Sequence, residues 1–230
     1  MFFDPMYLLI VGPAFLLSII AQIWVKSAFS RFSKVGLRTG MSGAEAASRI
    51  LQRAGVNVRV ERVGGFLSDH YDPRTRVLRL SPDVYEGRSL ASVGVAAHEA
   101  GHALQHATGY ALLQFRTAIV PVTQIGSQLA FPLLFIGLIF QSLGLVYAGI
   151  LLFSFAVLFQ IVTLPVEIDA SRRALQLVRS EGIVVSDEES SGARKVLTAA
   201  AMTYIAAAAS AILTLIYFLL RAGLLGGRRD

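Results

Sequence analysis

The sequence contains no cysteine and little charge: Asp, Glu, Lys and Arg together make up 16% of its 230 residues. The absence of cysteine excludes disulfide bonds and thiolate metal sites, so any bound metal must be held by histidine and carboxylate side chains. Apolar residues are abundant instead, at 54% of the chain with a mean hydropathy of +0.60. This exceeds the apolar content of an ordinary soluble domain, so much of the apolar surface must lie in lipid.

The charge that is present is basic, with a formal net charge of +6. A basic chain can bind nucleic acid, but here Lys and Arg are scattered and no aromatic side chains interleave with them. We therefore predict no nucleic-acid partner. The excess is typical instead of the cytoplasmic segments of a membrane protein, which are rich in Lys and Arg.

Four apolar segments are long enough to cross a bilayer, which takes about 20 helical residues. They divide the chain into an N-terminal transmembrane anchor (1–25), a cytosolic segment (26–118), a transmembrane hairpin (119–164) broken near residues 141–144, a second cytosolic segment (165–196), and a fourth transmembrane helix with its tail (197–230). The lipid bilayer is therefore a predicted partner.

The distribution of basic residues predicts the orientation in the membrane. Eighteen of the 21 Lys and Arg residues lie in segments 26–118 and 165–196, and the other three lie in the C-terminal tail. By the positive-inside rule, both segments face the cytoplasm. We therefore expect a protein of the bacterial plasma membrane with both termini outside.

Two helices of the first cytosolic segment have clear start signals. Ser42 and Glu45 form a capping box that predicts a helix over 43–54. Ser89 is a suitable N-cap for a helix over 90–107.

Other local signals complete the predicted fold. Alternating apolar residues indicate short strands at 56–60 and 77–80. Pro165 is typical of the first turn of a helix, which we expect to end near residues 181–182. The predicted fold class is a mainly α membrane protein with a small β element and about four transmembrane helices.

The helix predicted over 90–107 carries the pattern H-E-x-x-H, at His98, Glu99 and His102. Two histidines four positions apart lie on one helical face, so both imidazoles can reach one zinc ion. Glu99 projects beside them and can take a proton from the attacking water. The alternative is a helix whose polar face happens to carry these side chains, but the rest of this helix is apolar.

A third protein ligand is needed beside His98 and His102. His106 continues the same spacing, but eight residues along a helix correspond to about 12 Å, too far for His98 and His106 to share one ion. His70 is the remaining histidine. Glu167 is the strongest candidate, because its predicted helix starts where the third span ends, at the same membrane face as the His98 helix. The alternative is that Glu167 is an acidic residue that favours a helix N-terminus.

Several stretches of the sequence resemble a known family: residues 68–74, 80–81, 93–103, 164–174 and 196–204. They resemble the bacterial membrane neutral zinc metallopeptidases of the YugP type and, more distantly, the HtpX-type membrane peptidases. The resemblance implies a gluzincin-like peptidase domain that binds one Zn²⁺ per chain. It also implies that His98, His102 and Glu167 are the ligands and that Glu99 is the general base.

The resemblance leaves the residues around the ligands open. HtpX-type peptidases usually carry an Asp four residues after the ligand Glu, where it orients a ligand histidine, but here Ser171 holds that position and Asp169 lies two residues after Glu167. Either Asp169 or Ser171 could support a histidine. The reaction also needs an oxyanion donor besides zinc. The candidates for that donor are His70, Tyr71, Arg173 and Tyr204.

In gluzincin-like peptidases an extended substrate pairs with an edge strand just before the metal helix, through backbone hydrogen bonds. Here that strand is expected to comprise Arg76, Val77, Leu78, Arg79 and Leu80, in a short edge-stranded sheet. The expected substrates are peptides or proteins, membrane proteins among them.

Two other functions are compatible with the sequence. An intramembrane metalloprotease would carry H-E-x-x-H inside a span, whereas the helix over 90–107 lacks a clean apolar run of about 20 residues. A non-catalytic membrane scaffold with a structural zinc site would need a fourth protein ligand, for which Asp169 or His70 is available.

Overall fold

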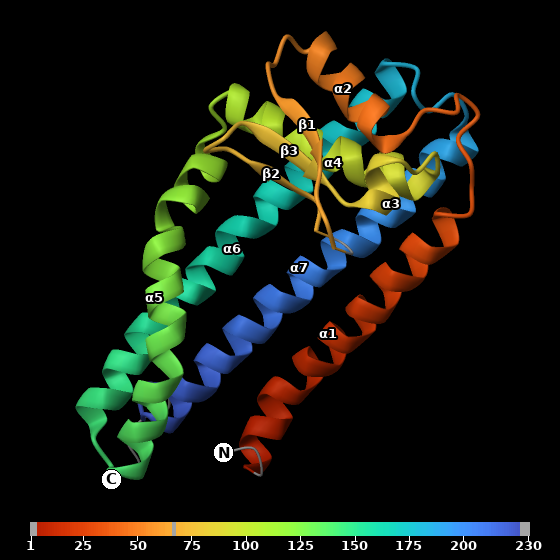
Figure 1. The fold of residues 1–230 in the computed structure, drawn as a ribbon. Coiled ribbons are helices and arrows are strands. Elements are labelled where there is room, and N and C mark those ends of the chain that lie inside the picture. The colour runs from red at the N-terminus through yellow and green to blue at the C-terminus, as the bar shows by residue number, and fades with distance from the viewer. Residues whose placement is uncertain (1–3, 66–67, 226–230) are drawn as a thin grey trace. The chain divides into compact units, whose positions relative to one another are not determined.

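The computed structural model describes residues 4–65 and 68–225, which are mainly helical (Figure 1). In chain order the elements are α1 (Pro5–Phe32), α2 (Gly43–Arg53), β1 (Arg59–Arg62), β2 (His70–Asp72), β3 (Val77–Leu80), α3 (Pro82–Tyr85), α4 (Leu90–Ala107), α5 (Ala111–Ile139), α6 (Leu143–Ser180) and α7 (Asp187–Arg221). They form two compact units. The membrane unit comprises the described residues up to 21, those from 114 to 165 and those from 203 on, and the polar unit comprises residues 22–113 and 166–202.

Four helices, α1, α5, α6 and α7, are long and apolar enough to cross a membrane. Their surfaces expose large apolar side chains, such as Leu9 on α1 (79% exposed) and Ile139 on α5 (73% exposed). Extended apolar surfaces of this kind are rare on soluble monomers but suit a lipid environment. The predicted fold class, a mainly α membrane protein with a small β element, is confirmed.

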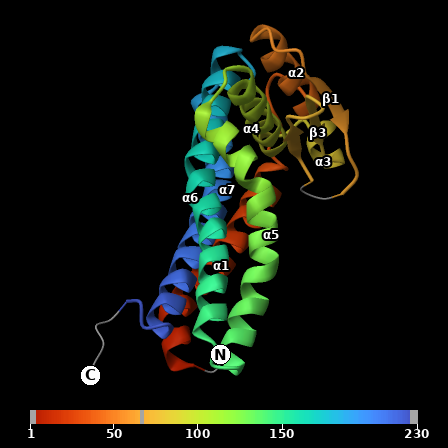
Figure 2. The same cartoon turned by 90° about the vertical axis from the view of Figure 1, so that its left-hand side faces the viewer.

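In the membrane unit, α5 and α6 form a hairpin and run side by side (Figures 1 and 2). A Cβ atom built at Gly149 of α6 would come within 2.7 Å of Leu134 Cγ on α5. Such small residues allow helix backbones to approach closely in lipid, where packing replaces the hydrophobic effect between helices. The turn between the two helices lies near the break that the sequence predicts at 141–144.

Helix α6 does not start at Pro165, as we expected, but runs without interruption from Leu143 to Ser180 with Pro165 inside it. A proline removes one helical N–H and usually breaks a helix in water. Membrane helices tolerate it, because neighbouring groups can satisfy the freed backbone. As a result, Glu167 lies well inside a helix, and the preference of acidic residues for helix N-termini does not explain its position.

The polar unit contains a three-stranded sheet in the order β1-β3-β2, in which β1 is parallel and β2 antiparallel to β3 (Figure 1). Strand β3 is therefore central, and the prediction of an edge strand at Arg76–Leu80 is wrong. The side chains show why: Val77, Leu78 and Leu80 are each at most 1% exposed, as in a strand that is covered by its neighbours. Arg76 lies just before the strand, with a left-handed backbone conformation (φ 52°).

The helix starts that the sequence predicts in this unit are confirmed. The capping box of α2 is present between Ser42 and Glu45. At the start of α4, Ser89 Oγ accepts a hydrogen bond from the backbone N–H of Ser92. Five alanines of α4 are fully buried in the core of this unit: Ala91, Ala96, Ala97, Ala100 and Ala103. Their short side chains let neighbouring elements approach the helix closely.

Helix α4 packs against α6 at Gly101. A Cβ atom built there would lie only 2.7 Å from the carbonyl oxygen of Ala170 on α6. Because this neighbour is backbone, no side-chain rotation can relieve the clash. Gly94, two turns earlier on α4, is different, since the nearest atom to a Cβ there is the carbonyl oxygen of Ala193 at 4.0 Å.

We expect Gly101→Ala and Gly94→Ala to have opposite effects on stability. Gly101→Ala forces α4 away from α6 and should destabilise the protein by roughly 1–3 kcal/mol, the usual effect of overpacking. Gly94→Ala has room for the methyl group and should stabilise the helix by roughly 0.5–1 kcal/mol, because alanine loses less backbone entropy than glycine. Thermal unfolding of both variants in detergent measures this difference. Equal shifts of Tm would contradict the close approach of the two helices.

Candidate metal centre

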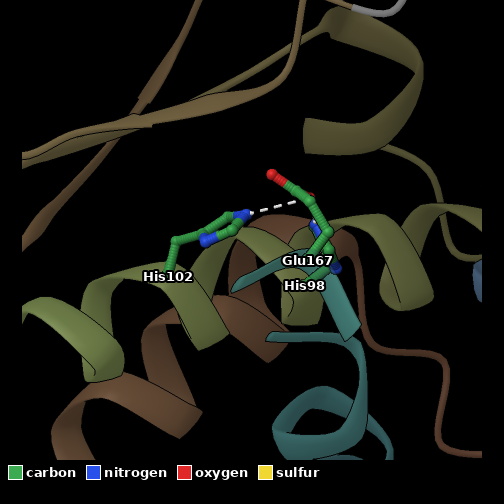
Figure 3. Close-up of side chains that lie close together, drawn as sticks. All are labelled: His98, His102 and Glu167. Carbon is green, nitrogen blue, oxygen red and sulfur yellow. Dashed lines mark hydrogen bonds and ion pairs between the residues drawn. The ribbon is translucent and has the colours of Figure 1, made fainter. Parts of the chain in front are cut away.

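His98 and His102 lie one turn apart on α4 and point toward Glu167, which is on α6 (Figure 3). Glu167 Oε2 is 3.1 Å from His98 Nε2 and 3.4 Å from His102 Nε2. The two imidazole rings are nearly perpendicular, with an interplanar angle of 85° and centroids 4.8 Å apart. One ligand atom from each of the three residues lies within 4.8 Å of the other two. The structure thus brings together the three residues predicted as metal ligands.

The donor set fits a zinc ion. Zinc binds His nitrogen and carboxylate oxygen at about 2.0–2.2 Å, so two ligands of a tetrahedral ion lie roughly 3.3–3.5 Å apart. The separations of 3.1 and 3.4 Å are close to that value. No fourth His, Asp or Glu joins the group within residues 4–65 and 68–225. Three protein ligands with a free fourth position are typical of a catalytic zinc site, whereas structural sites are closed by four.

Burial and negative charge together favour a cation within this cluster. The side chain of Glu167 is only 3% exposed, and the side chains of His98 and His102 are 12% and 11% exposed. Burial by itself would lower the pKa of His102, but the hydrogen bond to Glu167 and the negative charge of Glu99 outweigh burial and raise it. A positive charge at this position is therefore favoured, and a metal ion can supply it.

Each of these two histidines uses its other ring nitrogen for a second hydrogen bond. His98 Nδ1 is 3.1 Å from Ser171 Oγ, and His102 Nδ1 is 3.0 Å from Gln105 Oε1. Partners of this kind orient metal-binding imidazoles. Ser171 was one of the two candidates from the sequence for this role. Gln105 is not among the residues predicted from the sequence, although its position three residues after His102 on the same helical face could have indicated it.

Asp169, the other candidate, does not contact a ligand histidine directly. Its Oδ2 accepts hydrogen bonds from Gln105 Nε2 at 2.9 Å and from Arg173 Nε at 2.6 Å. The guanidinium of Arg173 also lies over the ring of Tyr110, 5.8 Å from its centroid. Arg173 is thus held by an ion pair and an aromatic ring, and its position is that of a support for Asp169.

Glu99 is 9% exposed and does not belong to the metal-binding group. Near it lies Asp69, at the start of β2. Burial raises the pKa of Asp69 and the negative charge of Glu99 raises it further, although the backbone N–H and hydroxyl of Ser81 both donate hydrogen bonds to its carboxylate. The start of β2 therefore lies within electrostatic reach of Glu99.

The remaining candidates from the sequence, His70, Tyr71 and Tyr204, do not belong to the group of His98, His102 and Glu167. His70 is exposed, and its Nδ1 is 2.7 Å from the backbone oxygen of Ser68. Tyr71 OH is 2.8 Å from His106 Nδ1, so His106 contacts β2 and not the metal ligands. Tyr204 lies on α7 within the membrane unit.

The chain is similar to known proteins over most of its length. Residues 7–223 match a family model described as "Putative neutral zinc metallopeptidase". The chain is 52% identical over 176 residues to the "Putative membrane protease YugP" of Bacillus subtilis (strain 168), which covers 76% of this chain and 78% of that protein. No solved structure matches the chain. Since the family model extends over almost the whole sequence, the chain belongs to the family described as "Putative neutral zinc metallopeptidase".

Proposed function

We propose that this protein is a membrane-bound peptidase that hydrolyses peptide bonds in peptides or proteins, with one zinc ion held by His98, His102 and Glu167. The observation that carries the proposal is the convergence of these three side chains from two helices on one point. Zinc bound there would act as a Lewis acid that activates water and polarises the substrate carbonyl.

Glu99 is the general base of the proposed reaction. It follows His98 directly on α4, so it lies beside the metal ligands without being one of them. Its carboxylate would take the proton of the attacking water and pass it to the nitrogen of the departing amine. Low exposure of Glu99 limits competition by bulk water for this proton.

The outer edge of β2 is the place where an extended substrate would bind. An edge strand offers unpaired backbone N–H and C=O groups to a second chain. Strand β2 pairs with β3 on one side, and its Tyr71 contacts His106 on α4. Asp69, at the start of the strand, lies within reach of the charge of Glu99. A peptide paired with β2 would therefore run close to the general base.

Two features support this function over the alternatives. Helix α4 is not among the four described helices that are apolar enough to span a membrane, which argues against an intramembrane metalloprotease. A structural zinc site would need a fourth protein ligand, and neither Asp169 nor His70 is near enough to join the group.

Replacing the general base should separate metal binding from catalysis. We expect Glu99→Gln to keep zinc and fold but to lower peptide hydrolysis by roughly 10²–10⁴-fold, because an amide cannot take a proton from water. The measurements are zinc content and cleavage of a fluorogenic peptide mixture by the detergent-purified protein. Glu61→Gln, at a partly exposed position on β1 where the carboxylate pairs with Arg59, serves as the matched control and should leave both unchanged. Loss of zinc together with activity in Glu99→Gln would show that Glu99 has a different role.

If Glu167 is the third ligand, variants at Glu167 and His106 should differ in zinc affinity in a definite order. Glu167→Ala should lower zinc binding below one ion per chain, and Glu167→Asp should lower it less, because the charge is kept but the reach is shorter. His106→Ala should leave zinc content unchanged, since His106 contacts Tyr71 instead. Metal analysis of the three purified variants tests the series. Full zinc content in Glu167→Ala combined with loss in His106→Ala would rule out the proposed ligand set.

We also propose that the active site faces the cytoplasm of a bacterial cell, as the distribution of Lys and Arg indicates. The natural absence of cysteine makes this testable with single cysteines. Arg74→Cys and Ser180→Cys, both at exposed positions, should react with a membrane-impermeant thiol reagent only after permeabilisation. Gly144→Cys, near the turn between α5 and α6, should react in intact cells, and a Cβ there meets no atom within 4 Å. The reverse pattern would invert the proposed topology.

A further inference from the structure

We propose that Gln105 is a positioning residue that fixes the tautomer of His102, leaving the lone pair of His102 Nε2 free for the metal. This inference rests on the proposed metal site but concerns a residue outside the ligand set. Gln105 is a polar side chain with no exposed surface. Its amide group makes three hydrogen bonds, to His102, Val166 and Asp169.

The orientation of the Gln105 amide follows from its partners on α6. Gln105 Nε2 lies 2.8 Å from the backbone oxygen of Val166 and 2.9 Å from Asp169 Oδ2. Both are acceptors, so the NH₂ group of the amide must face them and donate to each. The opposite orientation would place the amide oxygen against two other oxygens. Gln105 Oε1 must therefore face His102.

This orientation of the Gln105 amide determines which nitrogen of His102 carries the hydrogen that faces it. An amide oxygen only accepts hydrogen bonds, so His102 Nδ1, at 3.0 Å, must carry a hydrogen and donate it. In the neutral ring with this hydrogen on Nδ1, Nε2 keeps its lone pair, and the carboxylate of Glu167 takes its hydrogen bond from His98 Nε2 at 3.1 Å. His102 Nε2 is the atom that lies 3.4 Å from Glu167 Oε2, at the metal site.

His98 provides a contrast within the same site. Its Nδ1 lies 3.1 Å from the hydroxyl of Ser171, which can either donate or accept. The contact with Ser171 therefore orients the ring of His98 without fixing its tautomer. Of the two Nδ1 partners, Ser171 and Gln105, only the Gln105 oxygen is restricted to accepting a hydrogen from its histidine.

The amide of Gln105 is itself held in place. Asp169 accepts from Gln105 and also from Arg173 Nε at 2.6 Å, so a chain of hydrogen bonds runs from Arg173 to His102. Val166 and Asp169 lie on either side of Glu167 in the sequence of α6. The same amide thus ties the α6 segment that carries Glu167 to the histidine on α4.

The first test compares Gln105→Leu with Ser171→Ala. The protein has four histidines, so ¹⁵N-histidine NMR of the metal-free protein in detergent at alkaline pH can be assigned with single His variants. Wild-type His102 should be protonated at Nδ1, and Gln105→Leu should give a mixture of tautomers. Zinc affinity, measured by competition with a chelator, should fall by roughly 10–100-fold, as for other partners of metal-binding histidines. Ser171→Ala should leave the His102 tautomer unchanged.

The second test guards against a variant that simply fails to fold. Gln105→Glu keeps the shape and the acceptor for His102 but sets a carboxylate against Asp169, so zinc affinity should fall. The double variant Gln105→Glu/Asp169→Asn restores a donor opposite the new carboxylate and should recover part of that affinity. Equal losses in the single and double variants would overturn the proposal, as would an unchanged His102 tautomer in Gln105→Leu. Failure of the wild type to bind zinc would instead count against the proposed function, since the tautomer is read without metal.

Discussion

The contact on which the site depends is the approach of α4 to α6 at Gly101 and Ala170. Sixty-five positions of sequence separate His102 from Glu167, and neither helix alone carries a complete set of ligands. A glycine at 101 lets the α6 backbone come so near that even one methyl group would clash with Ala170. Only at this spacing does the short reach of a glutamate bring Glu167 Oε2 to both imidazoles.

The side chains of α4 also suit a helix that is closely packed on one side and carries the site on the other. Its core-facing alanines are fully buried, so the helix is enclosed by the polar unit while its other face carries His98, Glu99 and His102. Low exposure to solvent strengthens the electrostatic interactions within the site. The same enclosure would make the cluster unfavourable without a partner for its charge, so metal binding should contribute to the stability of this unit.

Local signals in the sequence predicted much of this arrangement. The pattern at His98, Glu99 and His102, the N-cap at Ser89 and the long apolar segments each depend on neighbouring residues alone. The sequence predicts Glu167 in the first turn of a new helix, but it lies inside α6. Pro165 does not end the helix, because in a membrane protein neighbouring groups can satisfy the backbone that a proline frees. The central place of β3 depends on strand order, a non-local property that its four residues do not encode. Gln105 was missed because a glutamine is chemically unremarkable until its three partners are known.

The charges of the site explain why a divalent cation suits it. Asp169 is balanced by Arg173 at 2.6 Å, so this pair adds no net charge near His102. The carboxylates of Glu167 and Glu99, with Asp69 within electrostatic reach of Glu99, then remain beside two imidazoles that would be neutral with a metal bound. A buried pair of negative charges is unfavourable unless positive charge offsets it. In the absence of metal a proton on His102 supplies part of that charge, which is why its pKa is raised despite burial. A zinc ion would supply more of it, with two positive charges, and the amide of Gln105 would keep His102 Nε2 ready to receive the ion.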